Sequence, residues 1–178
     1  DMTNPTRNNI ESLDTAVKNK LGGNSFTLSP KIEQLFKWIP YISTLISDFQ
    51  QSEVRKKLMT RLQTVALSET IVNGVLDPLK KITHRQRPDS TTQFDSFPSA
   101  HTATSFMGAE ILRQASKDKM PALAYSGYIM AIATAALRVH NKKSWLSDVV
   151  AGAALGIASA GVACWLVKEH NRKKAMEI

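Results

Sequence analysis

The chain lacks the features that mark a disulfide-rich or β-rich protein. Its 178 residues include one cysteine, Cys164, so no intramolecular disulfide can form, and we expect this residue to be a buried small side chain. No segment shows the alternation of polar and apolar residues that is typical of strands, and there is no repeat or low-complexity tract. Aromatic residues make up only 7% of the chain. Together with scattered basic residues and the lack of a known binding motif, this argues against nucleic-acid binding.

The chain also lacks a strongly apolar segment. Two uncharged runs, residues 120–137 and 149–167, are long enough to span a bilayer. Ala, Gly and Ser dominate both runs, which argues against strong membrane insertion. Gly152, Gly156 and Ala160 are spaced by four residues and instead predict close contact between helices. We therefore expect a compact helical bundle, soluble or membrane-attached, rather than a polytopic membrane protein.

Positive charge is abundant. The formal net charge of +8 favours anionic partners, such as a phosphorylated substrate or an anionic membrane surface. Phe36, Trp38 and Tyr41 lie near lysines and could make a peripheral membrane contact, with core packing as the alternative. The chain begins with Asp1, and the removal of a leader or anchor ahead of it is a hypothesis. It would fit an extracytoplasmic location, either periplasmic or membrane-attached.

Apolar spacing and helix boundary signals predict an all-α fold in a single domain, residues 1–178. We expect residues 1–9 and 170–178 to be flexible. Pro40 should kink or divide the second helix, and Pro78 should bend the third. The expected helices cover residues 10–21, 30–49, 52 to a point before Pro88, 99–116, about 118–140, and about 144–169.

A cationic connector with the sequence LRVHNKKSWLSD occupies residues 137–148, between the two uncharged runs. Arg138 can bind a phosphate or a carboxylate with two parallel hydrogen bonds. Ser144 and Asp148 are four residues apart, so they would share a face of a helix that begins near Ser144. The alternative is a solvated loop between two helices.

Two earlier stretches supply groups of the same kind. Lys80 is followed after six residues by Arg87 and a proline, and residues 98–101 read Pro-Ser-Ala-His at an expected helix start. The Ser99 hydroxyl and the backbone N–H of Ala100 would then form an anion site. His101 could protonate a leaving oxygen. With the arginine of the connector, these groups describe a phosphate clamp that needs no metal or other cofactor.

These three stretches resemble the signature of the type 2 phosphatidic acid phosphatase (PAP2) superfamily, which includes bacterial class A acid phosphatases and vanadium haloperoxidases. The family pattern is Lys-x6-Arg-Pro, then Pro-Ser-Gly-His, then Ser-Arg-x5-His-x3-Asp. The order and internal spacing agree, with Ala100 in place of Gly and Leu137 in place of Ser. The resemblance implies a compact helical bundle of the acid phosphatase–haloperoxidase type, with a catalytic core over about residues 52–167.

The resemblance also implies a function. It is the metal-independent hydrolysis of phosphomonoesters or diphosphates through a phosphohistidine intermediate, with lipid phosphates as the favoured substrates. The implied catalytic residues are His101, which protonates the leaving group, position 144, which attacks phosphorus, and Asp148, which orients the nucleophile. The implied phosphate-binding residues are Lys80, Arg87, Ser99, Ala100 and Arg138.

Ser144 departs from this pattern, because it stands where the family has its nucleophilic His. The motif places no base near the Ser144 hydroxyl, and Asp148 lacks the imidazole that it would orient. Loss of a nucleophile costs on the order of 10⁶ in rate in an unrelated triad enzyme. We therefore predict that this chain is an inactivated phosphatase. His140 is a poor substitute, because it lies only two residues after Arg138.

Two alternatives belong to other functional classes. A vanadate-dependent haloperoxidase would use the same clamp, but its metal bonds to the His at position 144, so Ser144 counts against it. A non-catalytic module that binds anionic lipids would keep the clamp without needing a nucleophile.

Overall fold

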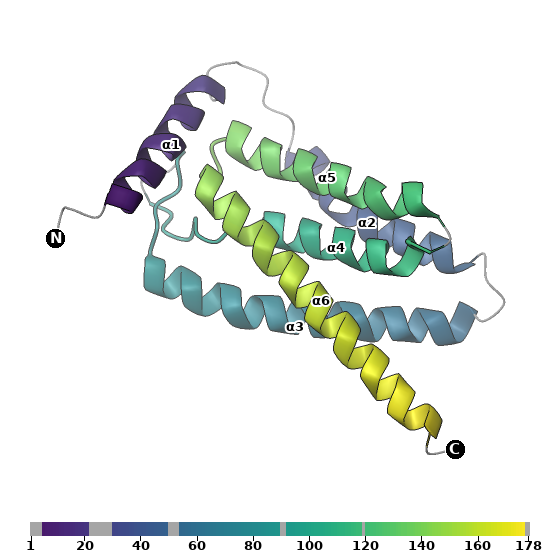
Figure 1. The fold of residues 1–178 in the computed structure, drawn as a ribbon. Coiled ribbons are helices and arrows are strands. Elements are labelled where there is room, and N and C mark those ends of the chain that lie inside the picture. Colours follow the sequence, from purple (N-terminus) through teal and green to yellow (C-terminus); the bar gives the residue numbers. More distant parts are fainter. Residues whose placement is uncertain (1–4, 22–29, 50–53, 90–91, 119, 177–178) are drawn as a thin grey trace.

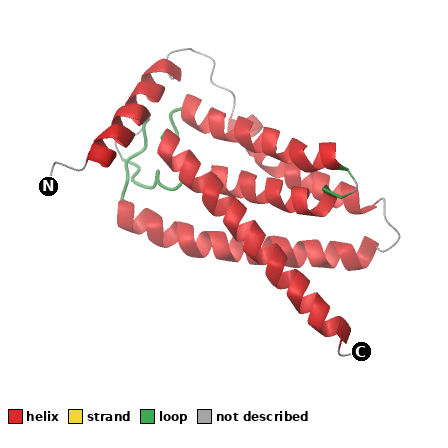
Figure 2. Ribbon diagram, viewed as in Figure 1, coloured by secondary structure: helices red, strands yellow, loops and turns green. Residues whose placement is uncertain are grey.

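The computed structural model describes residues 5–21, 30–49, 54–89, 92–118 and 120–176. Within these ranges all regular secondary structure is helical (Figure 2), which confirms the all-α prediction. The helices are α1 (Pro5–Leu21), α2 (Pro30–Phe49), α3 (Val54–Thr83), α4 (Ala100–Ser116), α5 (Pro121–His140) and α6 (Leu146–Met176).

Helix α4 is the centre of the bundle and packs against α2, α3, α5 and α6 (Figure 1). It can do so because small or apolar side chains cover most of its circumference, and its longest buried side chains fill the spaces between its neighbours. A second, smaller cluster lies where α5 and α6 meet and receives Val17 of α1. The main core consists of Tyr41, Val72, Leu76, Ala103, Met107, Ile111 and Ala160.

Helix α6 lies against α4 at two glycines. A Cβ atom added at Gly152 would lie 2.5 Å from the carbonyl oxygen of Ser99, and one added at Gly156 would lie 2.1 Å from that of Ala103. Neither distance leaves room for a side chain, so the absence of a Cβ lets the two backbones touch. The predicted close contact between helices is confirmed. It places the first turn of α6 beside the first turn of α4.

Neither internal proline ends its helix, so the predicted division at Pro40 does not occur, while the kink at Pro40 and the bend at Pro78 stay predictions. Helix α2 runs through Pro40, and α3 continues past Pro78 for more than a turn. Pro40 is buried in the bundle, and packing of this kind commonly overrides a local breaking tendency. Ser52, the predicted start of α3, lies outside the described residues.

Both chain ends contain more helix than predicted. Helix α1 begins at Pro5, because proline is well suited to the first position of a helix. Helix α6 continues to Met176, and Arg172 pairs with Glu169 one turn earlier at 2.9 Å. The prediction of flexibility was therefore wrong for residues 5–9 and 170–176. Residues 1–4 and 177–178 lie outside the described part.

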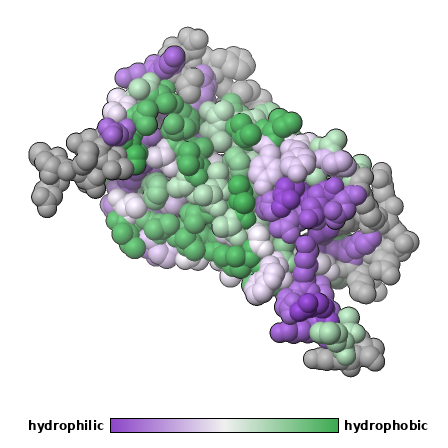
Figure 3. Space-filling view, viewed as in Figure 1, coloured by the Kyte–Doolittle hydropathy of each residue, from purple (hydrophilic) through white to green (hydrophobic). Residues whose placement is uncertain are grey.

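Helices α5 and α6 are the two described helices that are long and apolar enough to cross a membrane, judged by length and composition alone. Only 39% of the most apolar stretch of each is buried, so most of it lies on the surface. Figure 3 shows a broad hydrophobic area on this side of the molecule, and a hydrophilic area towards the end of α6. The exposed side chains include Tyr125, Ile129, Ile132, Val150, Ile157, Val162 and Trp165.

The contact at Gly156 gives a first prediction. Gly156→Ala should lower the free energy of unfolding by about 1–3 kcal/mol, because the methyl group would collide with the Ala103 carbonyl and force α6 outward. Gly161→Ala, in the same helix, is the matched control. A Cβ there meets nothing within 4 Å, so it should leave stability unchanged or raise it by up to about 1 kcal/mol. Chemical denaturation of both variants checks this, and equal stabilities would contradict the packing argument.

Candidate active site

The loop between α3 and α4, residues 84–99, is fixed at both of its ends. His84 takes a left-handed conformation with φ 43°, and its N–H donates to the Lys80 carbonyl at 3.1 Å, which caps α3. The His84 ring stacks on Phe94 with centroids 5.8 Å apart. Near the far end, the Ser96 N–H donates to the Arg85 carbonyl at 3.0 Å. The loop therefore folds back on itself and holds its arginines in defined positions.

The first turns of α4 and α6 meet at Ser99. Its N–H donates to the Asp148 carbonyl at 3.0 Å, and its hydroxyl lies 3.0 Å from that of Thr102. The Ser144 hydroxyl donates to the Ser99 hydroxyl at 3.3 Å. Both serines are almost fully buried. The second and third motif stretches, predicted to form one site, are thus in direct contact.

The connector turns tightly around Arg138. The carbonyl of this residue accepts the N–H groups of Lys143 and Ser144 at 2.9 and 3.2 Å, and Lys142 is left-handed with φ 56°. Arg138 is 7% exposed, and its guanidinium donates to the Lys143 carbonyl at 3.4 Å. Position 144 is therefore held directly beside Arg138.

The expectation that Ser144 and Asp148 share a helical face was wrong, because α6 begins only at Leu146. The Asp148 carboxylate is instead folded back towards the start of its own helix. It is fully buried and accepts the Trp145 N–H at 2.9 Å and the Ser96 hydroxyl at 2.5 Å, both on Oδ2. The bond from the Trp145 N–H is one of the two bonds of a capping box. In it, the acidic side chain at the third helical position accepts the N–H of the residue that precedes the helix.

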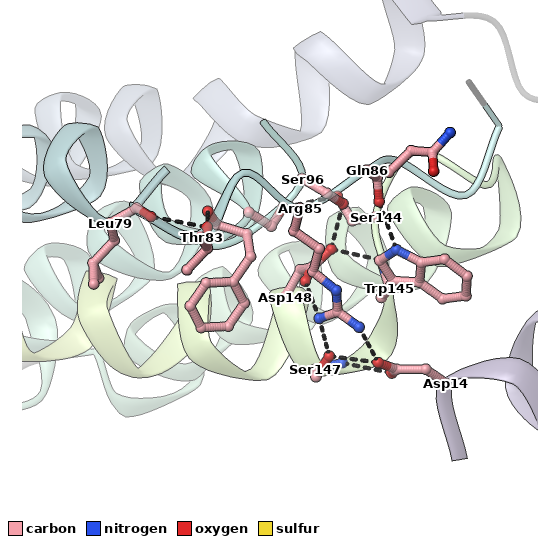
Figure 4. A network of polar contacts seen from close by, with 12 residues as sticks. Asp14, Leu79, Thr83, Arg85, Gln86, Ser96, Ser144, Trp145, Ser147 and Asp148 are labelled. Atoms are coloured by element: carbon pink, nitrogen blue, oxygen red, sulfur yellow. Dashed lines mark hydrogen bonds and ion pairs between the residues drawn. The ribbon is translucent and has the colours of Figure 1, made fainter. Parts of the chain in front are cut away.

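Arg85 supplies the remaining bonds to Asp148 (Figure 4). Its Nη1 donates to Asp148 Oδ1 at 2.6 Å, and its Nη2 donates to Asp14 Oδ2 of α1, also at 2.6 Å. Asp14 in turn accepts the N–H and the hydroxyl of Ser147 at 3.0 and 2.6 Å. The Trp145 ring lies between Arg85 and Lys18, at 5.5 and 5.1 Å from its centroid. Helix α1 is thereby attached to the site.

Sequence reasoning missed Arg85, Asp14 and Ser96 as contributors to this site. Arg85 lies within the noticeably cationic segment that contains Lys80 and Arg87, so its charge was a signal that could have been used. For Asp14 the sequence offered only a weak indication. It lies three residues before Val17, so the two side chains share a face of α1, and Val17 packs into the core.

The first motif stretch is organised by Asp95. Arg87 holds this carboxylate with two parallel hydrogen bonds, Nε to Oδ1 and Nη2 to Oδ2, each 2.8 Å long. These hydrogen bonds hold the pKa of Asp95 below its usual value, and the charges of Arg87 and Lys80 act in the same direction. Arg87, one of the predicted phosphate-binding residues, is thus paired with a carboxylate of its own loop. On the rim, Lys143 pairs with Asp89.

The two histidines considered for catalysis lie in different places. His101 is in the first turn of α4, two residues after Ser99 and partly buried. His140 ends α5, on the other side of the turn around Arg138. The geometry therefore places His101, and not His140, on the helix start that meets Ser144.

The Arg87–Asp95 pair gives a prediction about pH. The lowered pKa of Asp95 means that its stabilising effect is present above the unfolded pKa of about 3.9 and is lost as pH falls through the folded value. Asp95→Asn should therefore lower the free energy of unfolding at neutral pH, and with it the melting temperature. The loss should be less than about 1 kcal/mol, because the Asp95 side chain is 48% exposed. The difference from the parent should vanish in strong acid. Thermal unfolding across pH tests this, with the exposed Asp118→Asn as control, and a difference independent of pH would disprove it.

Comparisons with known proteins agree with the fold and the motifs. The sequence model of the PAP2 superfamily matches residues 58–172. The lipid A 1-phosphatase of Porphyromonas gingivalis is 31% identical over 146 residues, which is 82% of this chain and 32% of that protein. The chain thus spans about a third of the length of this curated relative.

Two crystal structures have a similar fold. Aquifex aeolicus LpxE has a TM-score of 0.59 at 18% identity, covering 86% of this chain and 93% of that one. The first transmembrane PAP2-type phosphatidylglycerolphosphate phosphatase from Bacillus subtilis has a TM-score of 0.54 at 20% identity, covering 93% and 88%. These likenesses confirm the predicted helical bundle. Since the family model matches well over half of the residues, the chain belongs to the PAP2 superfamily.

Proposed function

We propose that this chain is the catalytic part of a metal-independent phosphatase for lipid phosphates, and that Ser144 leaves it inactive or nearly so. The observation that carries the proposal is the contact between Ser99 and Ser144 beside the buried Arg138. It joins the start of α4 to the position of the family nucleophile, which is the geometry that phosphoryl transfer to a protein side chain requires.

Lipid phosphates are favoured by two independent observations. The relatives are named for lipid A and phosphatidylglycerolphosphate, which are both phosphorylated lipids. In addition, α5 ends and α6 begins at the site, so their exposed apolar side chains lead directly to it (Figure 3). A lipid could keep its tails against this surface while its phosphate reaches the cationic end. This supports membrane association. The extracytoplasmic location stays a prediction.

The phosphate would be held by charge and by the start of α4. Lys80, Arg87 and Arg138 supply positive charge, and the Ser99 hydroxyl with the Ala100 N–H supplies neutral donors. Such donors stabilise charge that builds up on the phosphoryl oxygens during transfer. The proposed clamp therefore works without a metal ion.

The parent reaction has two steps. An imidazole at position 144, held through its other ring nitrogen by Asp148, attacks phosphorus while the bond to the leaving oxygen breaks and His101 donates a proton to that oxygen. Water then attacks the phosphoenzyme, giving a proton to His101 and releasing phosphate and the free imidazole. Each step keeps the phosphoryl group within the clamp.

Ser144 cannot carry out the first step efficiently. Its hydroxyl is 2% exposed and donates to the Ser99 hydroxyl, which is too weakly basic to activate it. The carboxylate of Asp148 is engaged by Arg85, Ser96 and Trp145. The lack of a base beside the Ser144 hydroxyl also favours a second candidate function. In this function the chain is a non-catalytic module that binds anionic lipids through the proposed clamp.

Restoring the nucleophile is the direct test. Ser144→His should raise kcat/KM for a chromogenic phosphomonoester and for lipid phosphates by several orders of magnitude, up to about 10⁶. The assay contains a chelator, since the proposed mechanism needs no metal. Activity is compared across a panel that includes lipid A, phosphatidylglycerolphosphate and phosphatidic acid.

Three controls separate the alternatives. Ser144→Ala should remain as inactive as the parent, and His101→Asn in the Ser144→His protein should reduce its rate by about 10²–10⁴.

If Ser144→His gives no hydrolysis although phosphate still binds, the binding-module interpretation replaces the phosphatase. Oxidation of bromide by hydrogen peroxide, catalysed by the Ser144→His protein with vanadate, in place of hydrolysis, would identify a haloperoxidase. Activity of the Ser144 form itself would refute the assigned nucleophile position.

A further inference from the structure

We propose that Arg85 is a positioning residue for Asp148 and that α1, through Asp14, holds Arg85 in place, so that the N-terminal helix completes the active site. The inference rests on the proposed function, because Asp148 matters for catalysis only if position 144 carries a nucleophile. Helix α1 covers residues 5–21 and lies outside the 58–172 range that matches the family model. Its part in the site is therefore not implied by the family match.

The guanidinium of Arg85 is fixed between two buried carboxylates. Its Nη1 donates to Asp148 and to the Ser147 hydroxyl, and its Nη2 donates to Asp14, each at 2.6 Å. The side chains of the two carboxylates are 0% exposed at Asp148 and 3% exposed at Asp14. Buried carboxylates are costly unless they are paired and hydrogen-bonded. The carboxylates of Asp14 and Asp148 therefore restrain the position and the plane of the Arg85 guanidinium (Figure 4).

A simple attachment of α1 to α6 would not need this arrangement. Asp14 already binds both the N–H and the hydroxyl of Ser147 in the first turn of α6, and Val17 packs into the small core cluster. Arg85 adds a bond to Asp148, the carboxylate that the family resemblance assigns to orienting the side chain at position 144. Because Ser96 and Trp145 hold Oδ2 while Arg85 holds Oδ1, the rotation of the Asp148 carboxylate is fixed.

The charge of Arg85 also acts on position 144. Asp148 alone would favour the protonated form of an imidazole there, and the nucleophile must be unprotonated. A guanidinium 2.6 Å from Asp148 offsets that carboxylate and keeps the imidazole pKa lower. The other charged or titratable groups near this end come from each adjoining element, and they are unchanged between the Ser144→His protein and its Arg85→Met variant. They are Asp14 and Lys18 of α1, Arg87 and Asp95 of the loop, His101 of α4, Arg138 and His140 of α5, and Lys142 and Lys143 of the connector.

The experiment uses the full chain with Ser144→His. Arg85→Met is added to it, and Arg113→Met is the matched control. Arg113 pairs with Glu110 at 2.6 Å, and its side chain is 30% exposed against 26% for Arg85. Both changes remove an arginine from a largely buried carboxylate, but the control lies further along α4, away from its first turn. Each protein is compared for folding by circular dichroism.

Two readouts follow the introduced imidazole. NMR titration of ¹⁵N-histidine-labelled protein identifies its signal as the one that the Ser144 protein lacks. Arg85→Met should raise its pKa by roughly one unit and move the acidic limb of the pH–kcat profile to higher pH by the same amount. It should also lower kcat at neutral pH by about 10-fold to 100-fold, the size usual for residues that orient a functional side chain. KM should change much less.

Two more variants test the fork and the helix. Arg85→Lys keeps the charge but cannot hold two carboxylates in one plane, so the imidazole pKa should stay near that of the Ser144→His protein while kcat falls. Asp14→Asn should lower kcat in the Ser144→His protein but have no further effect on kcat once Arg85 is replaced, since the two act through one contact.

The outcomes are distinct. If Arg85→Met behaves like Arg113→Met in both titration and pH profile, Arg85 has only a structural role and the proposal is wrong. Full kcat in Arg85→Lys would also overturn it, and this variant decides the matter if Arg85→Met does not fold. If the Ser144→His protein hydrolyses no substrate, the proposed function fails, while the titration still shows whether Arg85 controls the imidazole at position 144.

Discussion

The buried carboxylate of Asp148 is the constraint on which the arrangement of this end of the bundle depends. It has no exposed surface, and a buried charge is tolerated only when several donors satisfy it. Its donors come from two segments, Arg85 and Ser96 in the loop after α3 and Trp145 at the start of α6. Because Arg85 also binds Asp14, α1 is drawn into the same network. One carboxylate thus fixes how the loop and two helices meet.

The packing of α6 on α4 makes this network possible. Gly152 lets α6 approach the Ser99 carbonyl so closely that no side chain would fit, and the Ser99 N–H can then reach the Asp148 backbone. The arginines of the candidate site, Arg85 and Arg138, lie at this end of the molecule, while apolar side chains are exposed along α5 and α6. This end therefore combines positive charge with a neighbouring apolar surface, as the proposed lipid phosphate substrate would need.

Sequence could predict the part of the site that is set by local spacing. The motif order and the four-residue glycine spacing were enough to place Ser99, Arg138 and Asp148 at one end of a helical bundle. Arg85 could be seen only as one cation among several, because its role depends on how α1 approaches in three dimensions. The same limit explains Pro40, which local rules treat as a helix breaker and which burial in the bundle accommodates.

The network also explains how Ser144 can occupy the position proposed for the nucleophile without disturbing the fold. If the Asp148 carboxylate depended on an imidazole at position 144, replacing that imidazole would leave a buried charge without its partner, which costs about 3–5 kcal/mol. Here Arg85, Ser96 and Trp145 satisfy the carboxylate, and none of them belongs to position 144. The Ser144 hydroxyl finds its own acceptor in Ser99. The contacts that support Asp148 are therefore independent of the side chain at position 144, so this position can change while the network and the fold remain.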